Sequence, residues 1–369
     1  MKIVAALTFS ILLASGLFAC QVPVFRYALE RWQADNFHLL VTSKGPLDKA
    51  LRSDLEYLQK SLETEPRPIN LELEVIDLAT LTEAQRISIP GLEHAGEEPS
   101  MILLPPQSWQ TKEPAWSGAA TAENLAKLLD SPARQRCAEH LLKGESAVWL
   151  IVTSGDAEKD ERARALLETG LAKASSLLEI PAGVVRREDL NPKIENIDLD
   201  DVLRSDIPLK ISFVSETVSR DDPAEAIFLA TLVEPEALRS GEPLIVPVFG
   251  RARTAGPVAA SHLTVDRVFG ACEYLCGACS CQVKQGNPGY DLLFKISWDE
   301  HLNSTIITAD SEIVQQALDV VTFGSSDDPA ESSGGLASGL PILPTMISVG
   351  AILLALTYLF ALGRKTAAP

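Results

Sequence analysis

Histidine, methionine and positive charge are scarce in this sequence. Its 369 residues contain five histidines and three methionines, too few for the His-rich or Met-rich ligand sets of metal-handling proteins. Its 32 basic residues are outnumbered by 50 acidic ones, which gives a formal net charge of −18. Because nucleic-acid binding depends on cationic contacts with phosphates, this balance argues against a nucleic-acid partner.

Common catalytic spacings are also missing. The histidines form no His-Glu-x-x-His pair, and no Gly-x-Ser-x-Gly nucleophile elbow occurs. Segment 250–256 carries two arginines between glycines but lacks the Lys-Ser or Lys-Thr of a phosphate-binding loop. We expect solvated loop charges there, with an anion site as the alternative. No catalytic residue and no cofactor is assigned, and whether the protein is an enzyme stays open.

The N-terminus has the pattern of a secretory signal peptide. In residues 1–19, Lys2 precedes an apolar run that ends shortly before Cys20. Leu17 and Ala19 before this cysteine resemble the bacterial lipobox, in which the cysteine is lipidated and becomes the mature N-terminus. We therefore expect the signal peptide to be removed and Cys20 to carry acyl chains, with ordinary cleavage as the alternative.

A long apolar stretch near the C-terminus predicts a transmembrane helix. Residues 342–362 contain no charged side chain, and at about 1.5 Å per residue they span roughly 30 Å, the thickness of a hydrocarbon core. Arg364 and Lys365 follow and place the tail, 363–369, in the cytoplasm. The small and polar residues 324–341 predict a flexible stalk. These features predict a single-pass protein of the bacterial cell envelope whose N-terminal domains lie outside the cytoplasm.

The intervening chain contains a repeated pattern. Two apolar runs, 37–43 and 147–154, both end in Val-Thr-Ser and predict buried strands. After each run, aliphatic residues share one helical face with the same spacing of four, four, three and four. They are Leu47, Leu51, Leu55, Leu58 and Leu62 in the first copy, and Ala163, Leu167, Leu171, Ala174 and Leu178 in the second. Two copies of a strand–helix unit are therefore expected.

Further elements complete an α/β pattern. More strands are predicted at 70–76, 101–106, 209–214 and 244–250, with a helix around Leu125 and Leu128. This alternation predicts an α/β fold, and its order resembles the thioredoxin-like fold. We expect two such strand–helix–strand units in tandem, 20–130 and 146–323, joined by a connector helix within 131–145. Two loops rich in Pro, Gly and Glu, 90–100 and 108–118, are expected to be mobile.

Four cysteines lie within ten residues: Cys272, Cys276, Cys279 and Cys281. A redox thioredoxin carries Cys-x-x-Cys after its first strand, whereas the equivalent stretches 43–46 and 154–157 contain no cysteine. Helical spacing from Val265 places Cys276-Gly-Ala-Cys279 at a helix C-terminus, where the dipole disfavours a thiolate.

The preferred interpretation of this cluster is one or two structural disulfides, since the compartment is oxidising. A soft-metal site for Zn²⁺ or Cu(I), or thiol exchange, is the alternative. Cys137 lies on the apolar face of the connector helix and is expected to be buried rather than to act as a ligand.

Segments 20–32 and 279–293, with the loop 249–253 and the final apolar helix, resemble an uncharacterised family of bacterial envelope proteins. The resemblance implies no known activity. Within the second segment, a compact turn leads into an expected strand, 292–297. We expect a membrane-anchored, extracytoplasmic binding or scaffold protein whose partners are the membrane and other envelope proteins. The alternative is a thiol-redox or soft-metal-handling protein that uses the cysteine cluster.

Overall fold

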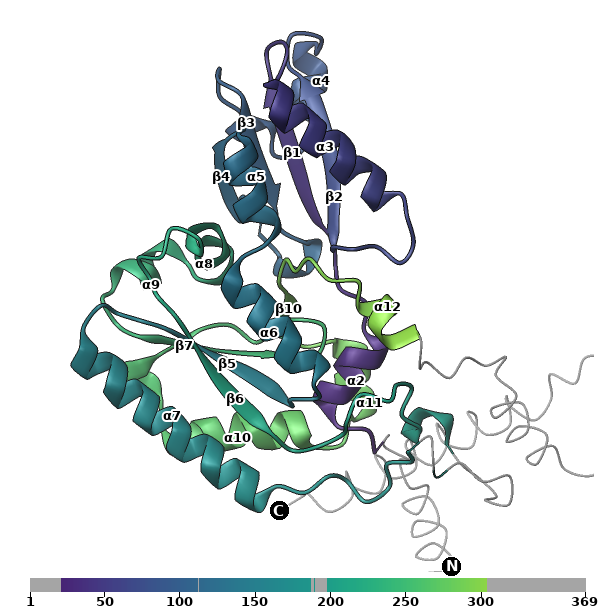
Figure 1. Cartoon of the computed structure of the whole chain (residues 1–369), viewed down its shortest axis with the longest axis vertical. Coiled ribbons are helices and arrows are strands. Elements are labelled where there is room, and N and C mark those ends of the chain that lie inside the picture. Colours follow the sequence, from purple (N-terminus) through teal and green to yellow (C-terminus); the bar gives the residue numbers. More distant parts are fainter. Residues whose placement is uncertain (1–20, 112, 187–188, 190–197, 304–369) are drawn as a thin grey trace, which may run out of the picture. The chain divides into compact units, whose positions relative to one another are not determined.

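The structure is a computed structural model that describes residues 21–111, 113–186, 189 and 198–303 (Figure 1). The predicted signal peptide, Cys20, the stalk, the transmembrane span and the tail lie outside these ranges. In the described part of the chain, no helix is both long enough and apolar enough to cross a membrane. The chain divides into the units Met1–Thr322 and Phe323–Pro369, and every described residue belongs to the first.

The smaller sheet has four strands in the order β2–β1–β3–β4. β1 is parallel to β2 and antiparallel to β3, which is antiparallel to β4. Helix α3 connects β1 to β2, and α5 follows β4. The bounds are β1 Phe37–Ser43, α3 Lys49–Leu62, β2 Leu71–Asp77, β3 Ser100–Leu104, β4 Trp116–Ala119 and α5 Ala122–Leu129. The predicted helix face is confirmed, because Leu51, Leu55 and Leu58 are buried.

The two faces of this sheet are covered differently. Phe37, Leu39 and Val41 point toward α3 and α5 and form one core with them. The alternate residues point to the opposite face, where Leu40 and Ile102 pack with Leu92 of the one-turn helix η1 (Leu92–His94) and with Leu81 and Ile89, which flank the short helix α4 (Glu83–Ser88). A helix pair therefore covers the first face, and the second face has a thinner cover.

The larger sheet repeats this order. Its strands run β10–β8–β7–β5–β6, with β9 also paired to β7. β5 is parallel to β6 and antiparallel to β7; α7 connects β5 to β6, and α10 follows the short strands β8 and β9. The bounds are β5 Ala147–Val152, α7 Ala157–Leu177, β6 Phe213–Val218, β7 Leu244–Phe249, β8 Arg253–Thr254, β9 Val258–Ala259, α10 Val265–Cys276 and β10 Tyr290–Asp291.

Both parallel strand–helix connections begin in the same way. Asp48 caps α3 and Asp156 caps α7, each side chain accepting hydrogen bonds from two backbone N–H groups of the first turn. The α/β class is confirmed, and the two sheets are both mixed.

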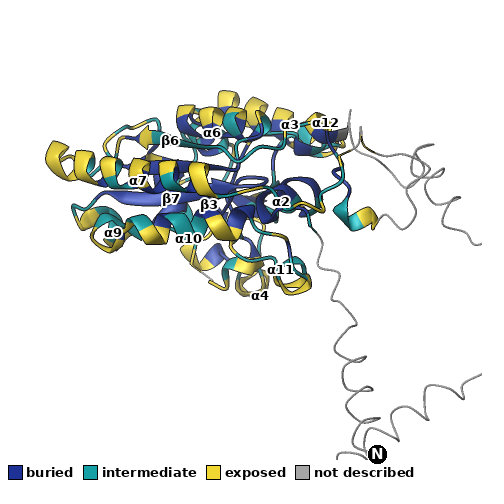
Figure 2. Ribbon diagram, turned by 90° about the horizontal axis from the view of Figure 1, so that it is seen from below, coloured by how far each residue is buried: buried dark blue, intermediate teal, exposed yellow. Residues whose placement is uncertain are grey.

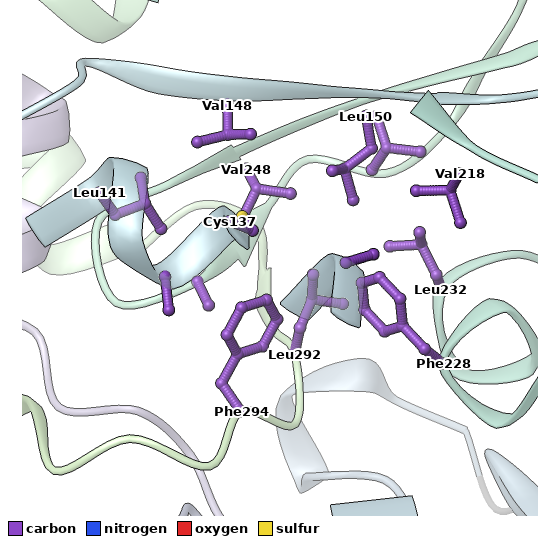
Figure 3. Packing of buried hydrophobic residues seen from close by; sticks show 14 of the residues in the cluster. Cys137, Leu141, Val148, Leu150, Val218, Phe228, Leu232, Val248, Leu292 and Phe294 are labelled. Atoms are coloured by element: carbon purple, nitrogen blue, oxygen red, sulfur yellow. The ribbon is translucent and has the colours of Figure 1, made fainter. Parts of the chain in front are cut away.

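Helices cover both faces of the larger sheet (Figures 1 and 2). On one face, α7, α10 and α2 (Val24–Arg31) form one core with Trp149 and Ile151. On the other, α6 (Pro132–Leu142) and α8 (Ala226–Leu232) pack against Val148 and Val248 (Figure 3). Cys137 of α6 is buried in this second core, as predicted. Among the described residues, the other helices are α9 Pro235–Arg239, α11 Cys281–Gly286 and α12 Trp298–Asn303, with one-turn helices at Gln107–Trp109, Leu199–Asp201 and Ala260–His262.

Two strand predictions were inaccurate. The strand expected at 209–214 begins later, because β6 covers Phe213–Val218. The strand expected at 292–297 is absent, since regular pairing ends at Asp291. The backbone of this segment is bound by the Asn70 side chain instead. Asn70 donates to the Leu292 carbonyl at 3.1 Å and accepts from the Phe294 N–H at 3.1 Å. These contacts join the chain after β10 to the smaller sheet.

Candidate functional site

The structure places the four clustered cysteines in two environments. Cys272 and Cys276 lie on the inner face of α10, and Cys279 follows in the same buried core. Cys281 is exposed at the start of α11. Helix α10 ends at Cys276 with Gly277 as its cap, as the sequence predicted. No disulfide joins any two cysteines of the described chain.

The buried thiols are poorly suited to thiolate chemistry. Burial raises the pKa of Cys272 and that of Cys276 to about 12, and it also raises the pKa of Cys137. Both thiol exchange and metal ligation require the thiolate. In addition, the described residues include no three His, Cys, Asp or Glu side chains grouped to hold a metal ion. The folded chain thus places three of these cysteines in one buried core, apart from the exposed Cys281.

The cysteine segment instead holds the start of the described chain. The Cys279 N–H donates to the Val22 carbonyl at 3.0 Å, and the Val24 N–H donates to the Gly277 carbonyl at 3.0 Å. Pro23 and Ala278 form an isolated antiparallel bridge between these bonds. The residues that follow Cys20 are thus fixed against the end of α10.

The loop 249–253 differs from its prediction, because Arg251 and Arg253 are buried rather than solvated. Arg251 donates to the Leu29 carbonyl at 2.9 Å and pairs with Asp299 at 2.8 Å. Arg253 pairs with Asp291 at 2.9 Å. Protein groups bind both guanidinium groups, so the alternative of an anion site is also unsupported. These contacts bring together three of the four segments on which the family resemblance rested; the fourth, the final apolar helix, lies outside the described residues.

A cleft of about 1190 Å³ lies against the face of the smaller sheet opposite α3 and α5. Its lining contains His38 of β1, Glu72 of β2 and Leu104 of β3. One wall is formed by α4, η1 and the adjoining loop, and the other by residues 105–111. Parts of both loops that the sequence predicted to be mobile thus form the walls of a hollow.

Acidic side chains dominate the charge of this cleft. Five carboxylates and one arginine line it: Asp35, Glu72, Glu83, Glu93 and Glu97, with Arg86. Glu97 pairs with Lys44, and this hydrogen bond lowers the pKa of Glu97. Glu72 accepts a hydrogen bond from the Asn36 amide at 3.3 Å. The remaining carboxylates leave the cleft with a clear negative balance, which favours cationic ligands.

The cleft has apolar surface as well. Leu92 and Leu104 contribute to its lining, and Ile87 of α4 is 78% exposed at the same site. Pro90, Pro105 and Pro106 are also lining residues, and proline restricts the backbone of both walls. The sequence showed the acidic, proline-rich loops but gave no sign that they face each other across the sheet.

A second, smaller groove of about 410 Å³ lies between α3 and α5. Tyr57, Leu125 and Leu129 contribute apolar surface to it, and Tyr57 is 78% exposed. Trp109, in the loop 108–118, packs edge-on against Phe37 and Tyr290, with ring centroids 5.5 and 4.9 Å apart. The larger acidic cleft is therefore the stronger candidate site.

Comparison with known proteins identifies no relative of this chain. No protein family, curated protein or solved structure matches the chain. The function must be inferred from the residues and their arrangement.

Proposed function

We propose that this chain is a membrane-anchored, extracytoplasmic binding or scaffold protein of the bacterial envelope. The observation that carries the proposal is the cleft of about 1190 Å³ on the smaller sheet. Ligand sites are typically concave, largely preformed, and lined by apolar groups with a few polar ones. The cleft combines Leu92, Leu104 and Ile87 with fixed charges in this way.

Two thioredoxin-like units form the body in this proposal. Support comes from the repeated order of strand, helix, parallel strand, two antiparallel strands and helix. The stretches 43–46 and 154–157 connect β1 to α3 and β5 to α7, where a redox thioredoxin would carry its cysteines. Serine, glycine and other residues without thiols occupy both stretches. The units would therefore serve as a binding framework.

Anchoring at both ends is supported by the sequence patterns at Cys20 and residues 342–362. The Gln21 N–H donates to the Asp201 carboxylate at 2.5 Å, so the chain meets the folded body one residue after Cys20. A lipid on that cysteine would hold the body directly at a membrane surface.

Two measurements test the anchors. Mass spectrometry of the N-terminal peptide should find an acylated Cys20, and an unmodified cysteine would refute lipidation. A reporter fused after Pro369 should be active only in the cytoplasm, and one inserted near Ser326 only outside it. The reverse pattern would refute the orientation.

The alternative, a thiol-redox or soft-metal-handling protein, is less well supported. Its four candidates are Cys272, Cys276, Cys279 and Cys281, of which only Cys281 is exposed. Raising the pKa of Cys272 and Cys276 to about 12 leaves almost no thiolate at neutral pH.

Site-specific photo-cross-linking in intact cells tests the binding function. A photoreactive residue replaces Ile87 in the cleft or, as a matched control, Leu177 on α7; these side chains are 78% and 62% exposed. We expect an adduct of discrete mass from position 87 and little from position 177. Absence of an adduct at 87, or equal yields at both positions, would contradict a binding role for the cleft.

A further inference from the structure

We infer that the acidic cleft of the smaller sheet binds an extended, basic segment of a partner polypeptide. The inference rests on the proposed binding function and adds the chemistry of the partner. It is carried by the size of the cleft, the signs of its charges, and its position on the thinly covered face of the smaller sheet.

The size favours a polymer over an ion or a small metabolite. Small-molecule sites usually measure roughly 300–1,000 Å³, whereas this cleft measures about 1190 Å³ and is open to solvent. Its lining extends from Asp35, before β1, to Glu97, before β3, and these residues lie at opposite ends of the antiparallel β1–β3 pair. An extended peptide can follow such a course and contact both walls.

The negative charge of the cleft favours a partner segment with positive charge. The five carboxylates come from separate parts of the wall and floor: Asp35 precedes β1, Glu72 lies on β2, Glu83 on α4, Glu93 on η1, and Glu97 in the following loop. Carboxylates distributed in this way can pair with successive lysine or arginine side chains along one segment. An anionic lipid surface is disfavoured, because these groups would repel its headgroups.

Apolar side chains and prolines of the cleft also suit a basic peptide. Leu104 in the floor and Ile87 on the wall provide apolar surface for the side-chain stems of lysine and arginine, which pack well on such surfaces. Pro105 and Pro106 restrict one wall, and a restricted wall loses less conformational entropy when a peptide binds.

Peptide binding to the full-length protein in detergent tests the inference. The probe is a fluorescein-labelled octapeptide of alternating lysine and alanine, and the comparison peptide replaces each lysine with glutamate. We expect saturable binding of the basic peptide, measured by fluorescence anisotropy, that weakens as ionic strength rises. The acidic peptide should not bind.

Matched variants locate the binding. Replacing Glu72, Glu83 and Glu93 with glutamine (E72Q, E83Q and E93Q) removes three charges from the cleft, and the same change at the exposed Glu158, Glu161 and Glu168 removes three from α7. Exposed ion pairs each contribute modestly, so the cleft variant should bind about tenfold more weakly or worse, and the α7 variant should bind within about twofold of the original chain. All six side chains are exposed, so folding should be unaffected, and the thermal midpoint of each variant verifies this.

The outcomes separate the two proposals. If the cleft variant and the α7 variant lose the same affinity for the basic peptide, the binding depends only on the net charge of the protein. That result would overturn the inference. Spermidine competing as strongly as the peptide would overturn the assignment to a polypeptide. If the Ile87 cross-link forms but the basic peptide does not bind, the binding function stands and this inference fails. If neither occurs, both fail.

Discussion

Arg253 donates from Nη1 to both carboxylate oxygens of Asp291, at 3.0 and 2.9 Å, and both side chains are buried. The rest of the guanidinium donates to the carbonyls of Asn287, Pro288 and Gly289. The Asp291 carboxylate also accepts the backbone N–H of Asp35, just before β1. One ion pair thus connects β8, the turn before β10, and the chain entering the smaller sheet.

Asp291 should make stability depend on pH. Burial raises its pKa from 3.8 to about 6, despite the opposing effect of Arg253. The folded state therefore holds the proton more tightly than the unfolded state, so this contribution is complete below pH 4 and is lost as pH rises through 6. A shift of about two pKa units corresponds to roughly 3 kcal/mol. Denaturant unfolding at several pH values should show that the stability difference between the original chain and Asp291→Asn falls by this amount between pH 4 and 7.

The control for this titration is Asp221→Asn, at an exposed carboxylate. This substitution removes one carboxylate and leaves the pair of Asp291 and Arg253 in place. A difference between the original chain and Asp291→Asn that stays constant from pH 4 to pH 7 would contradict the raised pKa.

Gly250 should be intolerant of alanine. Its φ is +59°, and an added Cβ would lie 2.6 Å from the Ala28 Cβ in α2. We expect Gly250→Ala to lower the unfolding free energy by about 2–5 kcal/mol, from left-handed strain and overpacking together. Calorimetry or denaturant unfolding measures the loss.

Gly241 offers a matched comparison. Its φ is +66°, but an added Cβ would meet no atom within 4 Å. Gly241→Ala should therefore cost only the strain, about 1–2 kcal/mol. Adding Ala28→Gly to the Gly250→Ala chain removes the methyl group that the new Cβ would meet. The double variant should therefore lose less unfolding free energy than the sum of the two single variants, by about 1 kcal/mol or more. Equal costs at the two glycines would mean that α2 is not packed as described.

Alkylation should distinguish the cysteines. In the folded chain we expect Cys281 to react and Cys272 and Cys276 to be protected, because Cys281 is exposed and the other two are buried. Since the described chain contains no disulfide, unfolding without reductant should make Cys272 and Cys276 reactive. Peptide mapping by mass spectrometry measures this. If they resist alkylation until reductant is added, the disulfide expected from the sequence is present.

Asn70 should be a stabilising link between the two sheets. Its amide donates to the carbonyls of Asp35 and Leu292 at 2.9 and 3.1 Å, and its carbonyl accepts from Phe294. Asn70→Ala should cost about 2–3 kcal/mol, because partly buried backbone groups lose their partners. The Phe294 amide should then exchange faster with deuterium. Asn70→Asp keeps the acceptor, so it should preserve more of that protection; equal exchange in all three chains would refute the link.

The spacing of apolar residues along the sequence predicted the helices that bury one side against a sheet. The repeated spacing after each Val-Thr-Ser located α3 and α7, because a helix that packs on a sheet needs an apolar stripe at that period. Gly277 marked the end of α10 for an equally local reason. These features depend on residues that are close together in the sequence, so the sequence pattern was sufficient to predict them.

Features that depend on distant partners were not predictable in this way. Arg251 and Arg253 look like solvated loop charges until Asp299 and Asp291 are seen to pair with them. The cleft likewise requires two loops, separated by β3, to face each other across one sheet. Nothing in the composition of either loop specifies that arrangement.

Helix α2 precedes the whole smaller sheet in the chain, yet its apolar side chains complete the core of the larger one. During synthesis, Phe25 is made long before Phe249 of β7 and Val268 of α10, which belong to the same core. Until β7 and α10 have been made, these apolar residues of α2 lack their packing partners. Such long-range closure slows folding and exposes the intermediate to aggregation. The core of the larger sheet is therefore complete only when α2 packs against β7 and α10.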